Sequence, residues 1–139
     1  MAAITTMTVR LATGNRSGAG TDGDIYVGIC GRELSLDSQA DDFEPGSNRE
    51  YIFGQNSNIR FATENDPRSP QLDTADLDKF PVYLRFEPDD SEDKWNLEEV
   101  NVTVNPDSAS SARYRAMGGA ALNLWMGKDF GKYAYLKEV

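Results

Sequence analysis

The sequence predicts an all-β protein, an antiparallel β-sandwich of two four-stranded sheets with about eight strands. Two observations support this prediction. Short segments in which apolar and polar residues alternate recur along the whole chain, and glycine, proline, asparagine and aspartate separate them. No segment longer than about twelve residues keeps a helical period. The chain, residues 1–139, is long enough for a single domain with one core and shows no internal repeat.

The first half of the chain supplies four of these strands. They are expected at residues 8–12, 25–30, 33–36 and 49–53, each with apolar residues at alternate positions. In the second strand Ile25, Val27 and Ile29 share one face. A reversal at residues 31–33 joins this strand to the third as a hairpin.

A long loop over residues 54–79 separates the two halves. It contains prolines and many turn-forming residues, with a helical turn expected at 74–79 and Thr74 as its cap. Residues 59–61 are interpreted as a short strand or as an anchor beneath the loop. The remaining strands are expected at 80–86, 95–104, 113–117 and 132–139, and the state of 122–126 is left open. Trp95 continues the strand pattern and is assigned to the core, whereas Trp125, Met126 and Phe130 are candidates for an exposed apolar patch.

Composition excludes several functions. The net charge of −9 and the pI near 4.4 argue against nucleic acid, which requires a basic surface, and against unaided adsorption to an anionic membrane. The chain has no histidine, which removes the commonest general base and most zinc sites. Cys30 is the single cysteine, so no intrachain disulfide forms, and a buried inert thiol is expected.

The sequence shows no membrane or secretory segment. No run of about 18 apolar residues is present, so no transmembrane helix is expected. The N-terminus lacks a basic region followed by an apolar block, which favours a soluble cytoplasmic protein, although a secreted protein trimmed of its signal would look the same.

Two oxygen-rich turns flank the strand at 25–30. They lie at residues 18–22 and 37–42, and the hairpin returns the second turn to the end of the sheet that carries the first. Carboxylates and free carbonyls gathered at one end suit calcium, which prefers six to eight oxygen ligands. Asp37 and Asp42 can converge on one ion. The alternative is that the aspartates accept hydrogen bonds from nearby backbone groups within the turns.

Four segments together resemble a known family. They are GAGTDGDIYVGICG, DDFEPGSNREYIF, WNLEEVNV and the closing LNLWMGKDFGKYAYL. In this order they are similar to the PLAT (lipoxygenase-homology) domain, and most similar to the C-terminal calcium-binding domain of clostridial alpha-toxin phospholipases. The resemblance covers most of the chain and implies a sandwich of two four-stranded sheets. Members of this family are usually non-catalytic modules that bind lipid surfaces or protein partners, often with calcium.

The resemblance also implies two to three calcium ions at particular residues. A first site falls on the carbonyls of Gly18, Gly20 and Lys94 and on Asp93. A second falls on Asp37, Ser38, the carbonyl of Ala40 and Asp42. A third ion fits between them at Asp22 and the carbonyls of Thr21 and Asp41.

The chain departs from the toxin pattern at its loop tips. Asp24, and Ser91 or Glu92, stand where the toxin domain carries aromatic residues that dip into membrane, which weakens the expectation of a lipid-binding role. Residues 59–71 look like an insertion that could bind a partner.

Three classes of function follow. The leading hypothesis is a calcium-binding module that recognises lipid headgroups or a protein partner. The second is a metal-independent structural or protein-binding sandwich, including an accessory subunit of a lipid-acting enzyme. The third, an enzyme, would need acid–base work by Asp41 and Asp42, or by Tyr26, Tyr83 or Lys94, and no cleft is predicted for them.

Overall fold

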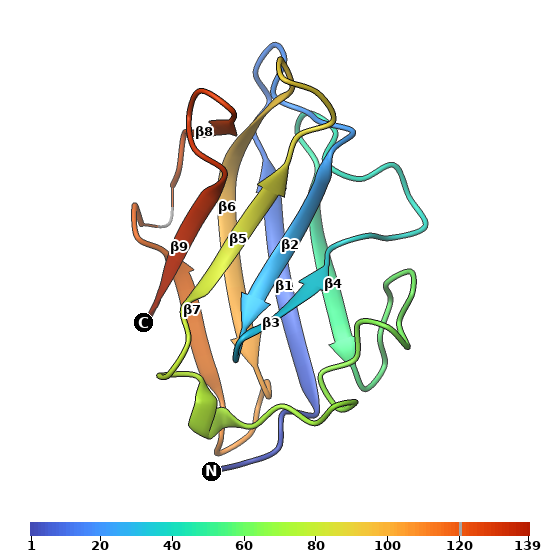
Figure 1. Cartoon of the computed structure of the whole chain (residues 1–139), viewed down its shortest axis with the longest axis vertical. Helices are drawn as coiled ribbons and strands as arrows, with labels where there is room; N and C mark the ends of the chain where they lie inside the picture. Colours follow the sequence, from blue (N-terminus) through green and yellow to red (C-terminus); the bar gives the residue numbers. More distant parts are fainter. Residues whose placement is uncertain (120) are drawn as a thin grey trace.

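The computed structural model describes residues 1–119 and 121–139, which form nine strands and one turn of 3-10 helix. The strands follow the chain as shown in Figure 1: β1 Thr6–Thr13, β2 Asp24–Ile29, β3 Arg32–Ser35, β4 Asn48–Gly54, β5 Val82–Glu87, β6 Lys94–Val104, β7 Ala112–Ala116, β8 Leu124–Gly127 and β9 Tyr133–Glu138. Each predicted strand is present, and β8 lies in the segment that the sequence left open. The predicted all-β class is confirmed.

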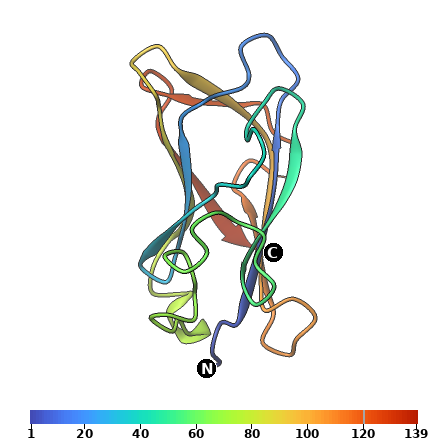
Figure 2. The same ribbon diagram turned by 90° about the vertical axis from the view of Figure 1, so that its right-hand side faces the viewer.

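The strands form a single antiparallel sheet that curls into a two-layered sandwich. Its order is β3-β2-β5-β9-β7-β6-β1-β4, and β8 pairs with β6. Strands β3, β2 and β5 lie in one layer and β6, β1 and β4 in the other, as Figure 2 shows from the side. Strands β9 and β7 pair with each other and carry the sheet from one layer to the other. The two layers are therefore continuous.

The core fills the space between the layers, with Trp95 at its centre. This side chain is fully buried (0% exposed), as predicted. Its ring centroid lies 5.8 Å from that of Phe43 and 5.9 Å from that of Phe86. Its Nε1 donates a hydrogen bond of 2.9 Å to the buried Thr13 Oγ1, so the polar edge of the ring is satisfied.

Two boundaries differ from the prediction for local reasons. Strand β5 begins at Val82, because Pro81 has no backbone N–H to pair and Phe80 lies exposed before it. Cys30 falls outside β2, in a two-residue turn where Cys30 and Gly31 both have positive φ. This is the turn geometry that matches the twist of a hairpin. The thiol is buried as expected, and burial raises the pKa of Cys30 to about 11.

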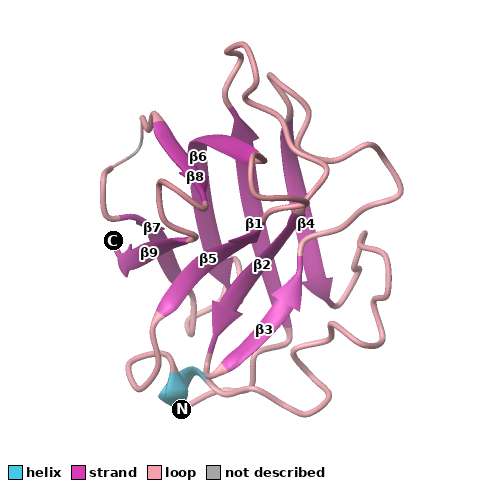
Figure 3. Cartoon of the chain, turned by 45° about the horizontal axis from the view of Figure 1, so that its top comes forward, coloured by secondary structure: helices cyan, strands magenta, loops and turns pink. Residues whose placement is uncertain are grey.

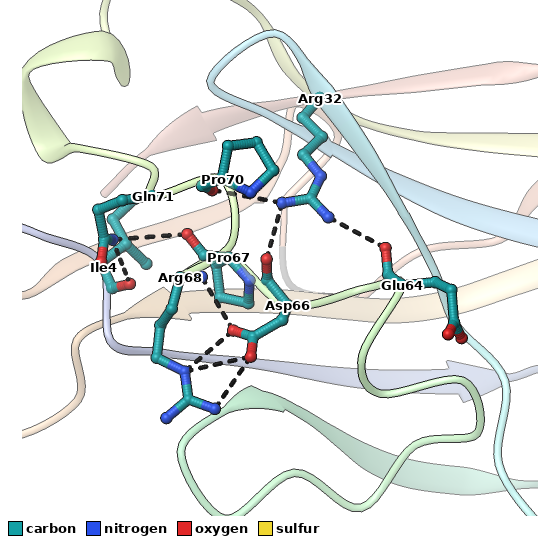
Figure 4. A network of polar contacts seen from close by, with 8 residues as sticks. All are labelled: Ile4, Arg32, Glu64, Asp66, Pro67, Arg68, Pro70 and Gln71. Atoms are coloured by element: carbon teal, nitrogen blue, oxygen red, sulfur yellow. Dashed lines mark hydrogen bonds and ion pairs between the residues drawn. The ribbon is translucent and has the colours of Figure 1, made fainter.

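The loop between β4 and β5 is tied to the body of the protein. Arg32 donates hydrogen bonds to the carbonyls of Glu64 and Asp66, at 3.0 and 2.7 Å (Figure 4). Gln71 Nε2 donates to the carbonyl of Ile4 at 2.9 Å. Ile59 is buried, so residues 59–61 act as an anchor and not as a strand. The long polar β4–β5 loop is therefore held against the sheet by these contacts and does not form a separate core.

The predicted helical turn is shorter than expected. It is a 3-10 turn over Thr74–Asp76, drawn as the short cyan segment in Figure 3. Its cap is Asp73, whose side chain accepts a hydrogen bond from Ala75 N, and not Thr74. Thr74 Oγ1 accepts from Ala2 N instead, at 2.9 Å.

The same loop covers both edges of the sheet. On β3, Ser35 N donates to Asn65 Oδ1 at 2.8 Å. On β4, Ile52 N donates to Asn58 Oδ1, and Asn58 Nδ2 donates to Glu50 O, both at 2.8 Å. These amide side chains form hydrogen bonds with backbone groups of the edge strands, which would otherwise be free to pair with another strand.

Removing both amides is therefore expected to promote association. The double variant Asn58→Ala with Asn65→Ala should lose roughly 2 kcal/mol of unfolding free energy and form larger species as its concentration rises. Light scattering measures the association. Gln55→Ala, which removes an exposed amide from the same loop, is the control. A double variant that stays as dispersed as this control would refute the protective role of the two amides.

Candidate functional site

One end of the sandwich carries a cluster of acidic loops, which we call the acidic rim. It comprises the β1–β2, β3–β4 and β5–β6 loops, seen at the top of Figure 1 and turned forward in Figure 3. Its carboxylates are Asp22, Asp24, Asp37, Asp41, Asp42, Glu44, Asp89, Asp90, Glu92 and Asp93. The prediction that the hairpin returns Asp37 to the end that carries residues 18–22 agrees with this arrangement.

Hydrogen bonds join the three loops of the rim. Thr21 N donates to Phe43 O at 3.1 Å, which links the β1–β2 and β3–β4 loops. Thr21 Oγ1 donates to Asp93 Oδ2 at 2.7 Å, which links the β5–β6 loop. A Cβ at Gly20 would lie 2.9 Å from Phe43 O and 2.7 Å from Pro45, so only glycine permits this approach. The rim is a connected unit.

Two adjoining clefts open between these loops. The first has a volume of about 500 Å³ and is lined by Gly18, Gly20, Thr21, Asp22, Glu44, Pro45, Asp89, Asp90, Glu92 and Asp93. The second, of about 190 Å³, is lined among others by Asp24, Asp37, Ala40, Asp41 and Asp42. Thr21 and Asp22 line both clefts, and none of the lining residues is basic.

Asp42 is the most enclosed carboxylate of the second cleft. Its side chain is 7% exposed. Ser38 N donates to its Oδ2 at 2.8 Å, and Ser38 Oγ and Tyr51 OH each donate to its Oδ1 at 2.7 Å. Asp93 is held similarly, since its Oδ2 accepts from Asp89 N at 2.8 Å as well as from Thr21. Each carboxylate therefore accepts a hydrogen bond from a backbone N–H of its own loop, as the alternative interpretation of the sequence expected, and another from a side chain outside that loop.

Two pairs of carboxylates face each other in the rim. Burial, followed by the neighbouring Asp42 carboxylate, raises the pKa of Asp37 above its usual value. The Asp41 carboxylate likewise raises the pKa of Glu44. Two arginines lie at the outer limit of ion-pair distance from the first pair: Arg49 Nε is 3.7 Å from Asp42 Oδ1, and Arg60 Nε is 4.0 Å from Asp37 Oδ2. A bound cation would relieve the repulsion within each pair.

The rim also presents carbonyl oxygens. Within residues 1–119 and 121–139, no donor bonds to the carbonyls of Gly18, Gly20, Thr21, Ala40 or Asp41. These are five of the six carbonyls that the sequence assigned to calcium; the sixth is that of Lys94, at the start of β6. Together with the carboxylates they form an oxygen donor set of the kind that calcium prefers, and in this respect the residues present fit the ion.

Other features of the rim do not point to a metal. The described residues contain no group of three or more histidine, cysteine, aspartate or glutamate side chains arranged to hold an ion. Lys94 is the first residue of β6. Its ammonium group lies over the ring of Trp125, 4.8 Å from the ring centroid. Ser38 is turned toward Asp42 through both of its donors.

An exposed aromatic residue beside the rim was only partly anticipated. Phe130, at the tip of the β8–β9 turn, is 56% exposed, whereas Met126 is buried. It lines a hollow of about 350 Å³ together with Asp93, Lys94 and Lys128. In the sequence, the glycines and charged residues around Phe130 indicate that this side chain is exposed. Only the fold shows that Phe130 adjoins the rim.

The fold and this set of loops define a β-sandwich of the PLAT type. Its structural neighbours are the C-terminal domain of clostridial alpha-toxin and lipoxygenase PLAT domains, which confirms the resemblance seen in the sequence. No protein-family model and no curated protein sequence matches the chain.

Three solved structures illustrate the similarity. Alpha-toxin from Clostridium absonum has a TM-score of 0.64 and 22% identity, over 97% of this chain and 32% of the toxin. Clostridium perfringens alpha-toxin has a TM-score of 0.60 and 20% identity, over 97% and 31%. Coral 8R-lipoxygenase has a TM-score of 0.60 and 21% identity, over 96% of this chain and 17% of the enzyme. The chain thus spans about a third of the toxins and a sixth of the lipoxygenase.

Proposed function

We propose that this protein is a non-catalytic module whose acidic rim binds calcium and then docks on a lipid surface. One observation carries the proposal. The carboxylates of Asp37 and Asp42 lie close together, beside carbonyls that accept no hydrogen bond in the described chain. Calcium would be held by the residues assigned from the sequence, with two to three ions at the three positions. Coral 8R-lipoxygenase, one of the structural neighbours, is described as activated by calcium through a C2-like domain.

Phe130 supports a lipid surface as the target. Asp24 and Glu92 make the other loop tips acidic, but Phe130 offers an exposed apolar ring beside the rim, with Lys128 and Lys132 on either side in the sequence. An aromatic ring can enter the membrane interface while lysines pair with anionic headgroups. Bound calcium would reverse the local charge of the rim and bridge it to phosphate. The described residues contain no helix that is long and apolar enough to span a bilayer.

Two observations support a non-catalytic role. The chain has no histidine to act as a general base. Cys30 is buried, and burial raises the pKa of its thiol to about 11, so the thiol stays protonated at neutral pH.

Vesicle sedimentation tests the proposal. Vesicles of phosphatidylcholine and phosphatidylserine should pellet the protein in calcium and leave it in solution in EDTA. Phe130→Ala should weaken binding about tenfold or more, because it removes the burial of one aromatic side chain. Phe80→Ala, an exposed phenylalanine beside the β2–β3 turn at the other end, is the control. Equal pelleting in calcium and EDTA, or equal binding by both variants, would contradict the proposal.

A metal-independent sandwich is the second candidate, and a specific observation favours it. The oxygens of Asp42 and Asp93 already accept hydrogen bonds from the protein, so these carboxylates stabilise the loops without an ion. In that case calcium would leave the melting temperature unchanged, and a protein partner would replace the lipid surface.

A further inference from the structure

The outer face of β2, β5 and β9 carries aromatic side chains that the acidic rim does not use. Strand pairing places them in two rows: Tyr26, Arg85 and Tyr133 lie opposite one another, and Gly28, Tyr83 and Tyr135 form the next row. We call this surface, defined by Tyr26, Tyr83, Arg85, Tyr133 and Tyr135, the tyrosine face. It lies on the layer that Figure 1 turns toward the viewer, below the rim.

Glu33 and Gly28 hold the tyrosine face in place. Arg85 Nε and Nη2 donate to the Glu33 carboxylate at 2.9 and 3.0 Å, and Tyr83 OH donates to Glu33 Oε2 at 2.7 Å. The guanidinium of Arg85 lies 4.4 Å from the ring centroid of Tyr26. A Cβ at Gly28 would lie 2.2 Å from the ring of Tyr83, so that ring lies against the glycine. Side chains fixed in this way lose little conformational entropy when a ligand binds.

Tyr133 and Tyr135 are the accessible part of this surface. They are 50% and 52% exposed, and their ring planes are within 9° of parallel with centroids 6.0 Å apart. The residues between and beyond them, Ala134 and Leu136, point inward and are buried. The tyrosines are therefore not needed to fill the core. Exposed, rigid phenol rings offer both a stacking surface and a hydrogen-bonding group.

Unpaired cations adjoin the tyrosines. Arg115 on β7 lies directly opposite Lys137 on β9, two residues beyond Tyr135, and Arg113 is exposed on the same side of β7. In the part of the chain that the structure describes, none of these three cations forms an ion pair with a carboxylate. Like charges directly opposite in a sheet destabilise it. Such a cluster on a protein of net charge −9 is complementary to an anionic ligand.

We propose that the tyrosine face binds an acidic polysaccharide, a chain of sugar rings that carries uronic carboxylates at intervals. The apolar faces of the sugars would stack on Tyr133 and Tyr135, and their carboxylates would pair with Arg115 and Lys137. Two other ligands fit less well. An extended peptide cannot add a strand at β3, because Asn65 covers that edge. A phosphate polymer carries a charge at every unit, whereas the cations of this surface, Arg113, Arg115 and Lys137, stand in one group beside the tyrosines.

Calorimetric titration with hyaluronate oligosaccharides tests this proposal. The titration is done in EDTA, so its outcome does not depend on the calcium site or on lipid. Saturable binding is expected, and raised salt should weaken it. Tyr133→Ala with Tyr135→Ala should weaken it about tenfold, the effect of two lost stacking contacts. Arg115→Ser with Lys137→Ser should weaken it without disturbing any aromatic ring. Phe61→Ala, an exposed phenylalanine of the β4–β5 loop, should leave it unchanged.

Several results would overturn the proposal. One is the absence of saturable binding, and another is equal affinity of the wild type and both double variants. Dextran binding as tightly as hyaluronate would exclude the role of charge. Tighter binding of single-stranded RNA or of polyglutamate would assign the face to a different class of macromolecule.

Discussion

Asp37→Asn is expected to raise the melting temperature of the calcium-free protein and to reduce its stabilisation by calcium, because it removes a ligand of the second site. Burial and the neighbouring Asp42 carboxylate raise the pKa of Asp37, so ionising this carboxyl costs more free energy in the folded state than in the unfolded chain. Asparagine removes that charge but also removes a charged ligand. If calcium binds as proposed, a hundredfold excess over its Kd should stabilise the wild type by about 2.7 kcal/mol, which is roughly 10 °C for a domain of this size.

The pH dependence has a defined sign. The pKa of Asp37 in the folded state lies above its usual value near 3.8, so the folded protein holds this proton more tightly than the unfolded chain does. The stability of the calcium-free wild type, relative to Asp37→Asn, should therefore fall as pH rises from the usual pKa through the raised one. Calcium should remove this fall. Melting temperatures of both proteins across this interval measure it.

Asp78→Asn is the matched control, because Asp78 is an exposed carboxylate beside the 3-10 turn, outside the acidic rim. It should change neither the calcium-free melting temperature nor the calcium response. A calcium-free melting temperature lowered by Asp37→Asn, or a full response to calcium in this variant, would contradict the role proposed for Asp37.

Trp95→Ala is expected to give the largest loss of stability of any single change considered. It removes a fully buried ring that packs on Phe43 and Phe86, and comparable truncations cost about 3–5 kcal/mol. Phe43 follows Asp42 in the β3–β4 loop, so the loss should also loosen the second cleft. Urea denaturation measures the free energy of unfolding. An unchanged slope of this free energy against urea concentration would show that the variant keeps the same folded state.

Two further variants separate packing from hydrogen bonding at this site. Thr13→Val leaves Trp95 Nε1 buried without an acceptor and should cost about 1–3 kcal/mol. Trp125→Ala, a change of the same size on the half-buried β8, should cost clearly less than Trp95→Ala. Equal losses for the two tryptophans would show that the core is not centred on Trp95.

The strands could be predicted because their pattern is local. Apolar residues alternate in most of the strands, as in Val82, Leu84 and Phe86 of β5, and this pattern is visible in one sequence. The continuity of the two layers could not be predicted, because it depends on the pairing of β9 with β7. Pairing partners distant in the chain leave no periodic signal.

The loops were predictable in composition but not in contacts. The sequence indicates that Asp37, Asp42 and Asp93 are oxygen donors at one end of the sheet, and the structure places them there. The hydrogen bonds from Tyr51 to Asp42 and from Thr21 to Asp93 join segments that are separate in the sequence. Only the fold could show them, and the same holds for Phe130, which adjoins the rim through the pairing of β8 with β6.

Calorimetric titration of calcium into EDTA-treated protein measures calcium binding by the acidic rim. We expect a saturable signal with a Kd at or below about a millimolar, and fewer bound ions in Asp37→Asn. A titration without saturable heat at millimolar calcium would contradict calcium binding and leave the rim as a set of hydrogen-bonded loops.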